Sequence, residues 1–326
     1  MSKVYKSIAE LVGNTPLVEL EQYEKKNELN AKIYGKLEYF NPTGSIKDRI
    51  ALQMILDAEE QGLIKPGDTI LDNTSGNTGI ALAAYGTLRG YKVVIAIEPG
   101  VSAERSQILR AYGAELKDLS EIPGAIEAAT APDATFQSLL KPMAAYAEEK
   151  GYFYINQCAN AANVNIHHET TGPEVWDALD GKVDIFVFMS GTNGTMQGAG
   201  GYLKEKNPDV QLVLVQPDEN SFPAPGKTEP SIDGIMRVSG VPDHLTPILY
   251  QRHGLKPDEV IIVAGSDAYE TGREIARTDG IFIGESSAAA LYAAKQLASR
   301  PENAGKNIVV VMADGGMKYL SKGMFV

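Results

Sequence analysis

Two short glycine-rich loops contain residues that could bind anions. The first, Thr74–Gly79 (TSGNTG), follows an expected strand ending at Leu71, and the second, Gly191–Thr195 (GTNGT), follows one ending at Phe188. A helix that starts in such a loop presents backbone N–H groups and a partial positive charge to an anion. A tight turn with an N-cap explains a single loop equally well. Two such loops in one chain favour anion binding.

A lysine is expected in the first turn of a helix, directly after a loop that contains proline and glycine. The segment Asn41–Arg49 (NPTGSIKDR) places Lys47 at this position. The positive end of a helix lowers the pKa of an ammonium group, and an amine must be neutral to act as a nucleophile. The position therefore suits a lysine that forms a Schiff base, although on its own it also fits a solvated surface lysine.

Other catalytic signatures fit the chain poorly. The second loop is not GxGxxG, and Gly226–Thr228 (GKT) lacks the upstream glycine and the strand of a P-loop. His167 and His168 are adjacent, so their side chains would point in different directions and would not form a metal pair. The GxSxG elbow of a serine hydrolase is missing, and the single cysteine, Cys158, is expected to be a small buried hydrophobe. We therefore predict neither a metal site nor a nucleotide site.

Length and composition narrow the classes of protein further. With 326 residues, 44% of them hydrophobic, the chain is long enough for about two domains with sizeable cores. A net charge of −12 opposes binding to nucleic acid. The most apolar stretches are of strand length, and the N-terminal residues lack the apolar run of a signal peptide. We expect a cytoplasmic protein with no membrane role.

Short β-branched runs alternate with amphipathic segments of helical length, which predicts an α/β fold with largely parallel sheets. The expected strands are 33–37, 69–71, 93–97, 185–188, 211–215, 260–263 and 308–312. The expected helices are 45–61, 77–89, 103–112, 195–205, 267–278 and 286–298. The segment Gln216–Pro230 is rich in proline and lacks periodicity, so we expect a long loop there.

Several segments, taken in order, resemble the cysteine synthase family, which comprises O-acetylserine sulfhydrylases and cystathionine β-synthases within the tryptophan-synthase-β-like group of pyridoxal-phosphate enzymes. The resemblance is collinear along the whole chain. It runs through LVGNTPL at 11–17, NPTGSIKDR at 41–49, TSGNTG at 74–79, TTGPE at 170–174, GTNGT at 191–195, GESS at 284–287 and KYLS at 318–321.

The resemblance implies a role for individual residues. Lys47 would carry pyridoxal 5'-phosphate as a Schiff base, Asn77 would bond its 3′ oxygen, and Ser286 would face its pyridine nitrogen. The cofactor phosphate would be held by the second loop: Gly191, Thr192, Asn193, Gly194 and Thr195. The carboxylate of an amino-acid substrate would be held by Thr74, Ser75, Gly76, Thr78 and Gln157.

The resemblance also implies an architecture and a reaction class. It implies two doubly wound domains with the cofactor in the cleft between them. Residues 1–40 and 158–326 would form the larger cofactor-binding domain, and residues 41–157 a smaller mobile domain. The chain would act as a homodimer on cysteine or an O-activated serine, by β-elimination and β-replacement through an α-aminoacrylate, with Lys47 moving the α-proton. A neutral hydroxyl at Ser286 would favour prompt β-elimination over transamination.

The sequence departs from the family pattern at positions that affect the choice of substrate. Asn193 replaces a usual glycine, Glu285 and Ala288 alter the usual GISSG, and Asp233 replaces a glutamine that sulfhydrylases usually carry before a glycine. A carboxylate can accept a proton that an amide cannot. We therefore predict that Asp233 activates water, so that L-cysteine and water give L-serine and hydrogen sulfide.

Three alternatives to this reaction stay open at the level of sequence. Asp233 can equally be a turn residue before Gly234. The reaction can instead be synthesis of cysteine from O-acetyl-L-serine and sulfide, or replacement by a thiol as in cystathionine β-synthase. A non-enzymatic alternative is a weakly active paralogue that binds serine acetyltransferase, which the intact Lys47 argues against.

Overall fold

A computed structural model describes residues 4–74, 76–97, 101–131, 134–222 and 230–326. Ser75 and the GKT triplet at 226–228 lie outside the described residues. The chain divides into two compact units. Unit 1 comprises Met1–Val12 and Lys47–Asn163, and unit 2 comprises Gly13–Ile46 and Val164–Val326.

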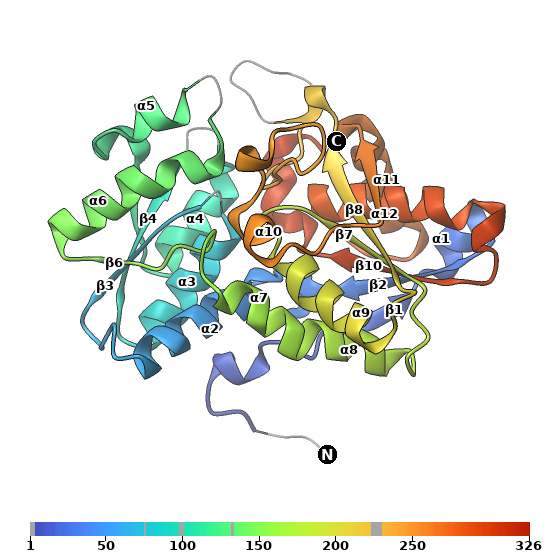
Figure 1. Ribbon diagram of the computed structural model, residues 1–326, viewed down its shortest axis with the longest axis horizontal. Coiled ribbons are helices and arrows are strands. Elements are labelled where there is room, and N and C mark those ends of the chain that lie inside the picture. Colours follow the sequence, from blue (N-terminus) through green and yellow to red (C-terminus); the bar gives the residue numbers. More distant parts are fainter. Residues whose placement is uncertain (1–3, 75, 98–100, 132–133, 223–229) are drawn as a thin grey trace. The chain divides into compact units, whose positions relative to one another are not determined.

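Unit 2 is built on a six-stranded sheet (Figure 1) with the order β1-β2-β10-β7-β8-β9. The short edge strand β1 runs antiparallel to β2, and all the other neighbours are parallel. Its strands are β1 (Leu17–Glu19), β2 (Lys32–Leu37), β7 (Ile185–Met189), β8 (Gln211–Pro217), β9 (Glu259–Val263) and β10 (Asn307–Met312).

The central strands of unit 2 are buried on both faces, because helices cover each side of a parallel sheet. Successive residues of β7 alternate between two cores: Ile185 packs with helix α12 (Glu285–Ala298), whereas Phe186 packs with α9 (Gly201–Lys206). Helix α12 lies against α11 (Gly265–Thr278), and its alanine-rich face permits close packing on the sheet. The other helices of this unit are α1 (Glu21–Lys26), α8 (Gly172–Ala178) and α10 (Ile248–His253).

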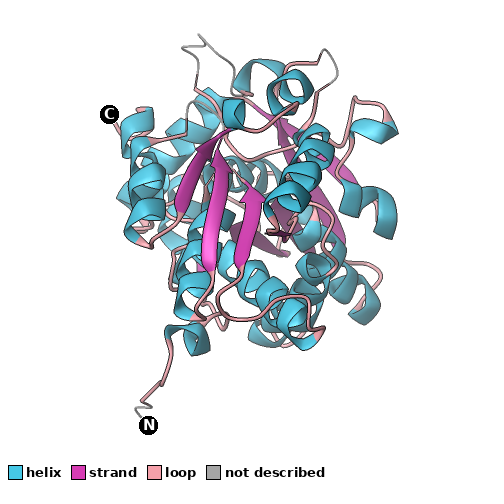
Figure 2. Cartoon of the chain, turned by 90° about the vertical axis from the view of Figure 1, so that its left-hand side faces the viewer, coloured by secondary structure: helices cyan, strands magenta, loops and turns pink. Residues whose placement is uncertain are grey.

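Unit 1 has a four-stranded parallel sheet with the order β5-β4-β3-β6. Its strands are β3 (Thr69–Asn73), β4 (Lys92–Ile97), β5 (Glu115–Asp118) and β6 (Phe153–Tyr154). Figure 2 shows helices on both sides of these strands. The helices of unit 1 are α2 (Lys47–Glu60), α3 (Asn77–Leu88), α4 (Ala103–Ala111), α5 (Ala125–Ala129), α6 (Leu140–Lys150) and, at its boundary with unit 2, α7 (Ala162–Ile166).

The structure confirms the predicted α/β class. The bounds of the expected strands and helices agree with observed ones to within about two residues, except that the helix expected at 195–205 is a π-helical turn, Met196–Gly200, followed by α9. The short strands β1, β5 and β6 were not predicted, nor were several helices, of which α6 has 11 residues. The expected long loop at 216–230 begins later than predicted, because β8 continues to Pro217 and a 3-10 turn follows at Glu219–Ser221. Residues 223–229 of that segment lie outside the described part of the chain.

Candidate active site

Lys47 is the first residue of helix α2 in unit 1, as the sequence predicted. The next residue, Asp48, is fully buried, and its Oδ1 accepts a hydrogen bond of 2.6 Å from Tyr85 Oη on α3. Burial and the nearby Asp48 raise the pKa of Tyr85, so this phenol stays protonated and remains a donor. The bond fixes α2 against α3 close to the end that carries Lys47.

The first glycine-rich loop joins β3 to α3, also in unit 1. Thr74 is buried, and Thr78 Oγ1 donates a hydrogen bond of 2.6 Å to Gln157 Oε1. A side chain at Gly76 would meet Arg105 Cδ at 2.4 Å, so this position requires glycine. Asn77 is the first residue of α3. The structure therefore brings Thr78 and Gln157, which are distant in sequence, into one loop region, whereas Ser75 lies outside the described residues.

A buried carboxyl group lies directly before this loop. Asp72 is 1% exposed, and among the described residues neither of its carboxyl oxygens has a hydrogen-bond partner. Burial raises its pKa to about 8, against the effect of nearby backbone N–H groups. Burial and the nearby Asp72 raise the pKa of the Cys158 thiol, although the charge of Lys47 acts to lower it. Cys158 is 4% exposed, which agrees with its expected role as a small hydrophobe rather than a nucleophile.

The second glycine-rich loop precedes a long helical segment of unit 2. Asn193 adopts a positive φ of 73°, a conformation that glycine and asparagine tolerate best. Asparagine at the usual glycine position therefore keeps the loop's backbone conformation. Its side chain bonds within the loop: Nδ2 donates to Ser190 Oγ at 3.1 Å, and Oδ1 accepts from Gln197 Nε2 at 2.8 Å.

Two π-helical turns support this loop. They span His167–Thr171 and Met196–Gly200 and pack against each other. A side chain at Gly198 would meet the Val164 carbonyl oxygen at 2.2 Å, so the two backbones approach closely. Buried His167 bonds Thr171 Oγ1 through Nδ1 at 2.8 Å, and its Nε2 lies 3.5 Å from Thr195 Oγ1.

The segment that carries Asp233 packs directly on the second loop, within unit 2. The Met236 N–H donates to the Ser190 carbonyl oxygen at 2.7 Å. A side chain on Gly191 would meet the Gly234 carbonyl oxygen at 2.9 Å, so this loop has no room for one. The Asp233 carboxylate pairs with Lys322 Nζ at 3.1 Å. Asp233 thus lies beside the loop predicted to hold phosphate.

Ser286 lies in the first turn of α12 and is half-buried. The next residue, Ser287, is fully buried and exchanges hydrogen bonds of 3.3 Å with the backbone of Asp314. These contacts fix the start of α12 to the end of β10 and so define the position of Ser286.

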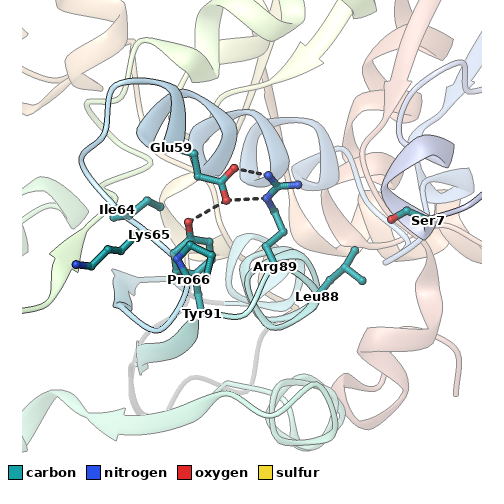
Figure 3. A pocket seen from close by; sticks show the side chains of 8 residues that line it. All are labelled: Ser7, Glu59, Ile64, Lys65, Pro66, Leu88, Arg89 and Tyr91. Carbon is teal, nitrogen blue, oxygen red and sulfur yellow. Dashed lines mark hydrogen bonds and ion pairs between the residues drawn. The ribbon is translucent and has the colours of Figure 1, made fainter.

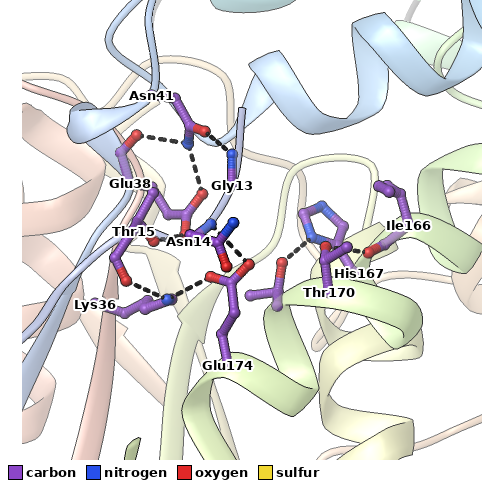
Figure 4. Close-up of polar contacts among 11 residues, drawn as sticks. Gly13, Asn14, Thr15, Lys36, Glu38, Asn41, Ile166, His167, Thr170 and Glu174 are labelled. Atoms are coloured by element: carbon purple, nitrogen blue, oxygen red, sulfur yellow. Dashed lines mark hydrogen bonds and ion pairs between the residues drawn. The ribbon is translucent and has the colours of Figure 1, made fainter. Parts of the chain in front are cut away.

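A buried polar network (Figure 4) explains three of the collinear motifs in unit 2. Asn41 Nδ2 donates to Glu38 Oε2, and Asn41 Oδ1 accepts from the Gly13 N–H at 2.8 Å. Thr15 Oγ1 donates to Glu38 Oε1 at 2.6 Å. On the other side, Lys36 Nζ bonds the Thr15 carbonyl oxygen and pairs with Glu174, both at 2.6 Å. The network thus ties Asn41, a few residues before Lys47, to the strand segment of Lys36 and Glu38 and to the chain at Gly13 and Thr15.

A cavity of about 590 Å³ in unit 1 (Figure 3) includes neither Lys47 nor any residue of the first glycine-rich loop. It is lined by Glu59, Arg89 and Tyr91, among others, and these three bond one another. Glu59 is near the C-terminal end of α2, so about 18 Å of helix separates it from Lys47. This cavity is therefore not the active site.

Comparison with known proteins identifies the chemistry. The family model described as "Pyridoxal-phosphate dependent enzyme" matches residues 8–314. The chain belongs to this family. A cysteine synthase of Staphylococcus aureus is 38% identical over 320 residues, covering 98% of this chain and 96% of the relative.

Solved structures give the same result for this pyridoxal-phosphate dependent enzyme. The crystal structure of a cysteine synthase from Entamoeba histolytica has a TM-score of 0.80 at 37% identity, covering 99% of this chain and 91% of that one. That of a hydrogen sulfide-producing enzyme from Fusobacterium nucleatum has a TM-score of 0.79 at 36% identity, covering 97% and 100%. The enzyme is thus cysteine synthase-like.

The residues present fit pyridoxal phosphate. In unit 2, a loop that excludes a side chain at Gly191 precedes a helix, which suits a phosphate group. In unit 1, Lys47 begins α2 and can supply the amine that holds the cofactor aldehyde. No helix among the described residues is long and apolar enough to cross a membrane.

Two residues that support the candidate site were not predicted from the sequence. His167 contacts the second loop, and Glu285 contacts the Asp233 turn. His167 lies just before the TTGPE motif, and Glu285 was noted only as a departure from the family pattern. These positions, next to or within family motifs, were the only signal in the sequence. The partners of the two side chains depend on tertiary packing.

Proposed function

We propose that this enzyme converts L-cysteine and water to L-serine and hydrogen sulfide. The Cβ–S bond of cysteine breaks, a Cβ–O bond to water forms, and the proton lost by water balances the proton gained by sulfide. No oxidant or reductant is required.

The side chains of the enzyme divide the work between them. Bound pyridoxal phosphate supplies an electron sink for the α-carbon of the substrate. Lys47 Nζ holds the cofactor, then removes the α-proton and later returns it. The substrate carboxylate is bound by the first loop and its neighbour: Thr74, Ser75, Gly76, Thr78 and Gln157. Asn77 and Ser286 orient the cofactor ring, and the loop from Gly191 through Thr192, Asn193 and Gly194 to Thr195 binds its phosphate.

Asp233 is the residue that would select water as the nucleophile. Its turn packs on the loop proposed to hold the phosphate, through the bond between Met236 and Ser190. Its carboxylate pairs with Lys322 Nζ at 3.1 Å, and a carboxylate is a group that can accept a proton from water. Sulfide needs no such base because it is largely ionised near neutral pH. A carboxylate at this position thus supports addition of water over addition of sulfide.

The relatives favour two reactions. The solved hydrogen sulfide-producing enzyme supports release of sulfide, whereas the relatives called cysteine synthase support the reverse use of sulfide with an activated serine. Synthesis of cysteine from O-acetyl-L-serine is therefore the second candidate function. Replacement by a thiol such as homocysteine is a third outcome that the same assay detects.

The deciding experiment incubates the purified enzyme, in separate reactions, with L-cysteine, O-acetyl-L-serine, O-phosphoserine or L-serine, with and without sulfide or homocysteine. Sulfide and amino-acid products are measured together. We expect serine and sulfide in equal amounts from L-cysteine. Lys47→Ala, which lacks the amine, is the inactive control. Faster formation of cysteine from O-acetyl-L-serine would favour the second candidate.

Asp233→Asn tests the residue itself, because it keeps the shape of the side chain and removes the base. We expect serine formation from L-cysteine to slow by at least about 100-fold, the usual scale of a lost general base. Asp243→Asn, an exposed aspartate in the same segment, is the matched control. Unchanged serine formation in Asp233→Asn would remove this residue from the mechanism.

We further propose that the enzyme is a homodimer and that residues 41–157 move as a smaller domain during turnover. Sedimentation velocity at several protein concentrations tests the dimer. Small-angle scattering with and without L-cysteine tests the motion, which should reduce the radius of gyration.

A further inference from the structure

A second carboxylate lies beside Asp233 in unit 2. Glu285, the first residue of α12, is fully buried. Its Oε2 accepts a hydrogen bond of 3.2 Å from the Asp233 backbone N–H, and its Oε1 accepts one of 2.7 Å from Tyr269 Oη. Both carboxyl oxygens therefore act as acceptors, and one of them holds the turn that carries Asp233.

Lys322 is the cation of this group, and it contacts only one of the two carboxylates. Its Nζ lies 3.1 and 3.3 Å from the Asp233 carboxylate oxygens, and these side chains are mostly buried. When both carboxylates are ionised, the charges of Asp233, Glu285 and Lys322 sum to about −1 in a poorly solvated place. Such an arrangement disfavours a second negative charge.

Burial, and after it the charge of Asp233, raises the pKa of Glu285 to about 7. The hydrogen bonds from Tyr269 and the Asp233 backbone, and the charge of Lys322, act to lower it. The titratable groups that face Glu285 are Asp233 on its turn, Tyr269 on α11 and Lys322 near the C-terminus. Burial and the nearby Glu285 also raise the pKa of Tyr269, which stays protonated and remains a donor. Glu285 thus changes charge near neutral pH.

We infer that Glu285 is a positioning residue that, in its ionised form, holds Asp233 in place for the addition of water. This inference rests on the proposed function. Protonation turns one of its two acceptor oxygens into a donor, so Glu285 no longer accepts well from both Tyr269 Oη and the Asp233 N–H. The Asp233 turn then loosens, and serine formation falls at acidic pH while the earlier release of sulfide does not depend on this turn.

The kinetic test uses L-cysteine between pH 5.5 and 8.5 and measures two rates: the release of sulfide in a single turnover and the formation of serine at steady state. In the wild type we expect the rate of serine formation, relative to single-turnover release of sulfide at the same pH, to fall about tenfold from pH 8 to pH 6, as one group with a pKa of about 7 requires. In Glu285→Gln, which accepts a hydrogen bond but does not titrate, this relative rate should not vary with pH. In Tyr269→Phe, which lacks the donor that favours the ionised form, the fall should move to higher pH.

A second measurement needs neither cofactor nor turnover. In the apoenzyme labelled with ¹³C at glutamate carboxyls, the Glu285 resonance should titrate near neutrality and be missing in Glu285→Gln. The ¹⁵N resonance of the Asp233 amide should move with the same midpoint in the wild type only. If the wild type makes no serine, the proposed function fails, whereas this NMR coupling still tests the positioning role. The inference is overturned if the Glu285 carboxyl stays ionised down to pH 5.5. It is also overturned if the Asp233 amide resonance does not shift as Glu285 titrates.

Discussion

At the scale of single residues, Asn193 shows how a substitution can preserve a loop. Its φ of 73° explains why asparagine can stand where the family usually has glycine, and its side chain bonds Ser190 and Gln197. The amide of Asn193 is engaged inside the protein, so we propose that this residue supports cofactor binding only through the shape of the loop.

Two substitutions at Asn193 distinguish shape from direct binding. Asn193→Gly keeps the backbone conformation and should retain pyridoxal phosphate through dialysis. Asn193→Ala must adopt a positive φ with a Cβ, which costs about 1–2 kcal/mol, and also loses two side-chain bonds. We expect a lower thermal midpoint and weaker retention for alanine. Loss of cofactor from the glycine variant would instead show that the amide itself binds.

Local sequence pattern and the family resemblance together predicted some features of the candidate site. Lys47 begins a helix as its Pro/Gly-containing loop suggested, and Thr78 meets Gln157 as the resemblance implied. Glu285 and His167 were not predicted as supporting residues, because their roles come from contacts with Asp233 and Thr195, which are far away in sequence. Local pattern carries no information about such partners.

At the scale of elements, the long apolar strands were predictable because both of their faces are buried in parallel sheets. Strands β1, β5 and β6 were missed, since they have two to four residues and largely exposed or half-buried side chains. The continuous helix expected at 195–205 contains a π-helical turn at Met196–Gly200, where Gly198 lets the chain pass close to Val164. That turn depends on its neighbour and not on periodicity.

The helix that follows the second loop supports a prediction about charge. Gly194→Asp places a carboxylate at the helix start, where it should repel the cofactor phosphate and lower cofactor occupancy. Gly201→Asp, at the first residue of α9, is the control because a side chain there meets open space. Absorbance of the bound cofactor after dialysis measures both. Equal occupancy in the two variants would contradict the assignment of this loop to phosphate.

At the scale of the whole molecule, buried carboxyls determine how stability depends on pH. Asp72 in unit 1 has a pKa raised to about 8 by burial, against about 4 for an unfolded chain. Between these two values the unfolded chain has lost the proton and the folded protein keeps it. The folded state then binds more protons, so stability falls as the pH rises through this window. This direction is opposite to that of an aspartate in a salt bridge.

Asp72→Asn tests that direction in the apoenzyme. Neither Asp72 carboxyl oxygen has a hydrogen-bond partner in the described part of the chain, so a neutral amide of the same shape removes the titration and breaks no hydrogen bond of the side chain there. We expect the thermal midpoint of the wild type to drop from pH 5 to pH 8 more than that of Asp72→Asn, with the variant the more stable of the two at pH 8. Asp209→Asn, at an exposed position, should follow the wild type at every pH. Parallel curves for Asp72→Asn and the wild type would show that Asp72 is ionised in the folded protein, and its burial would then require a partner cation or water beside the first loop.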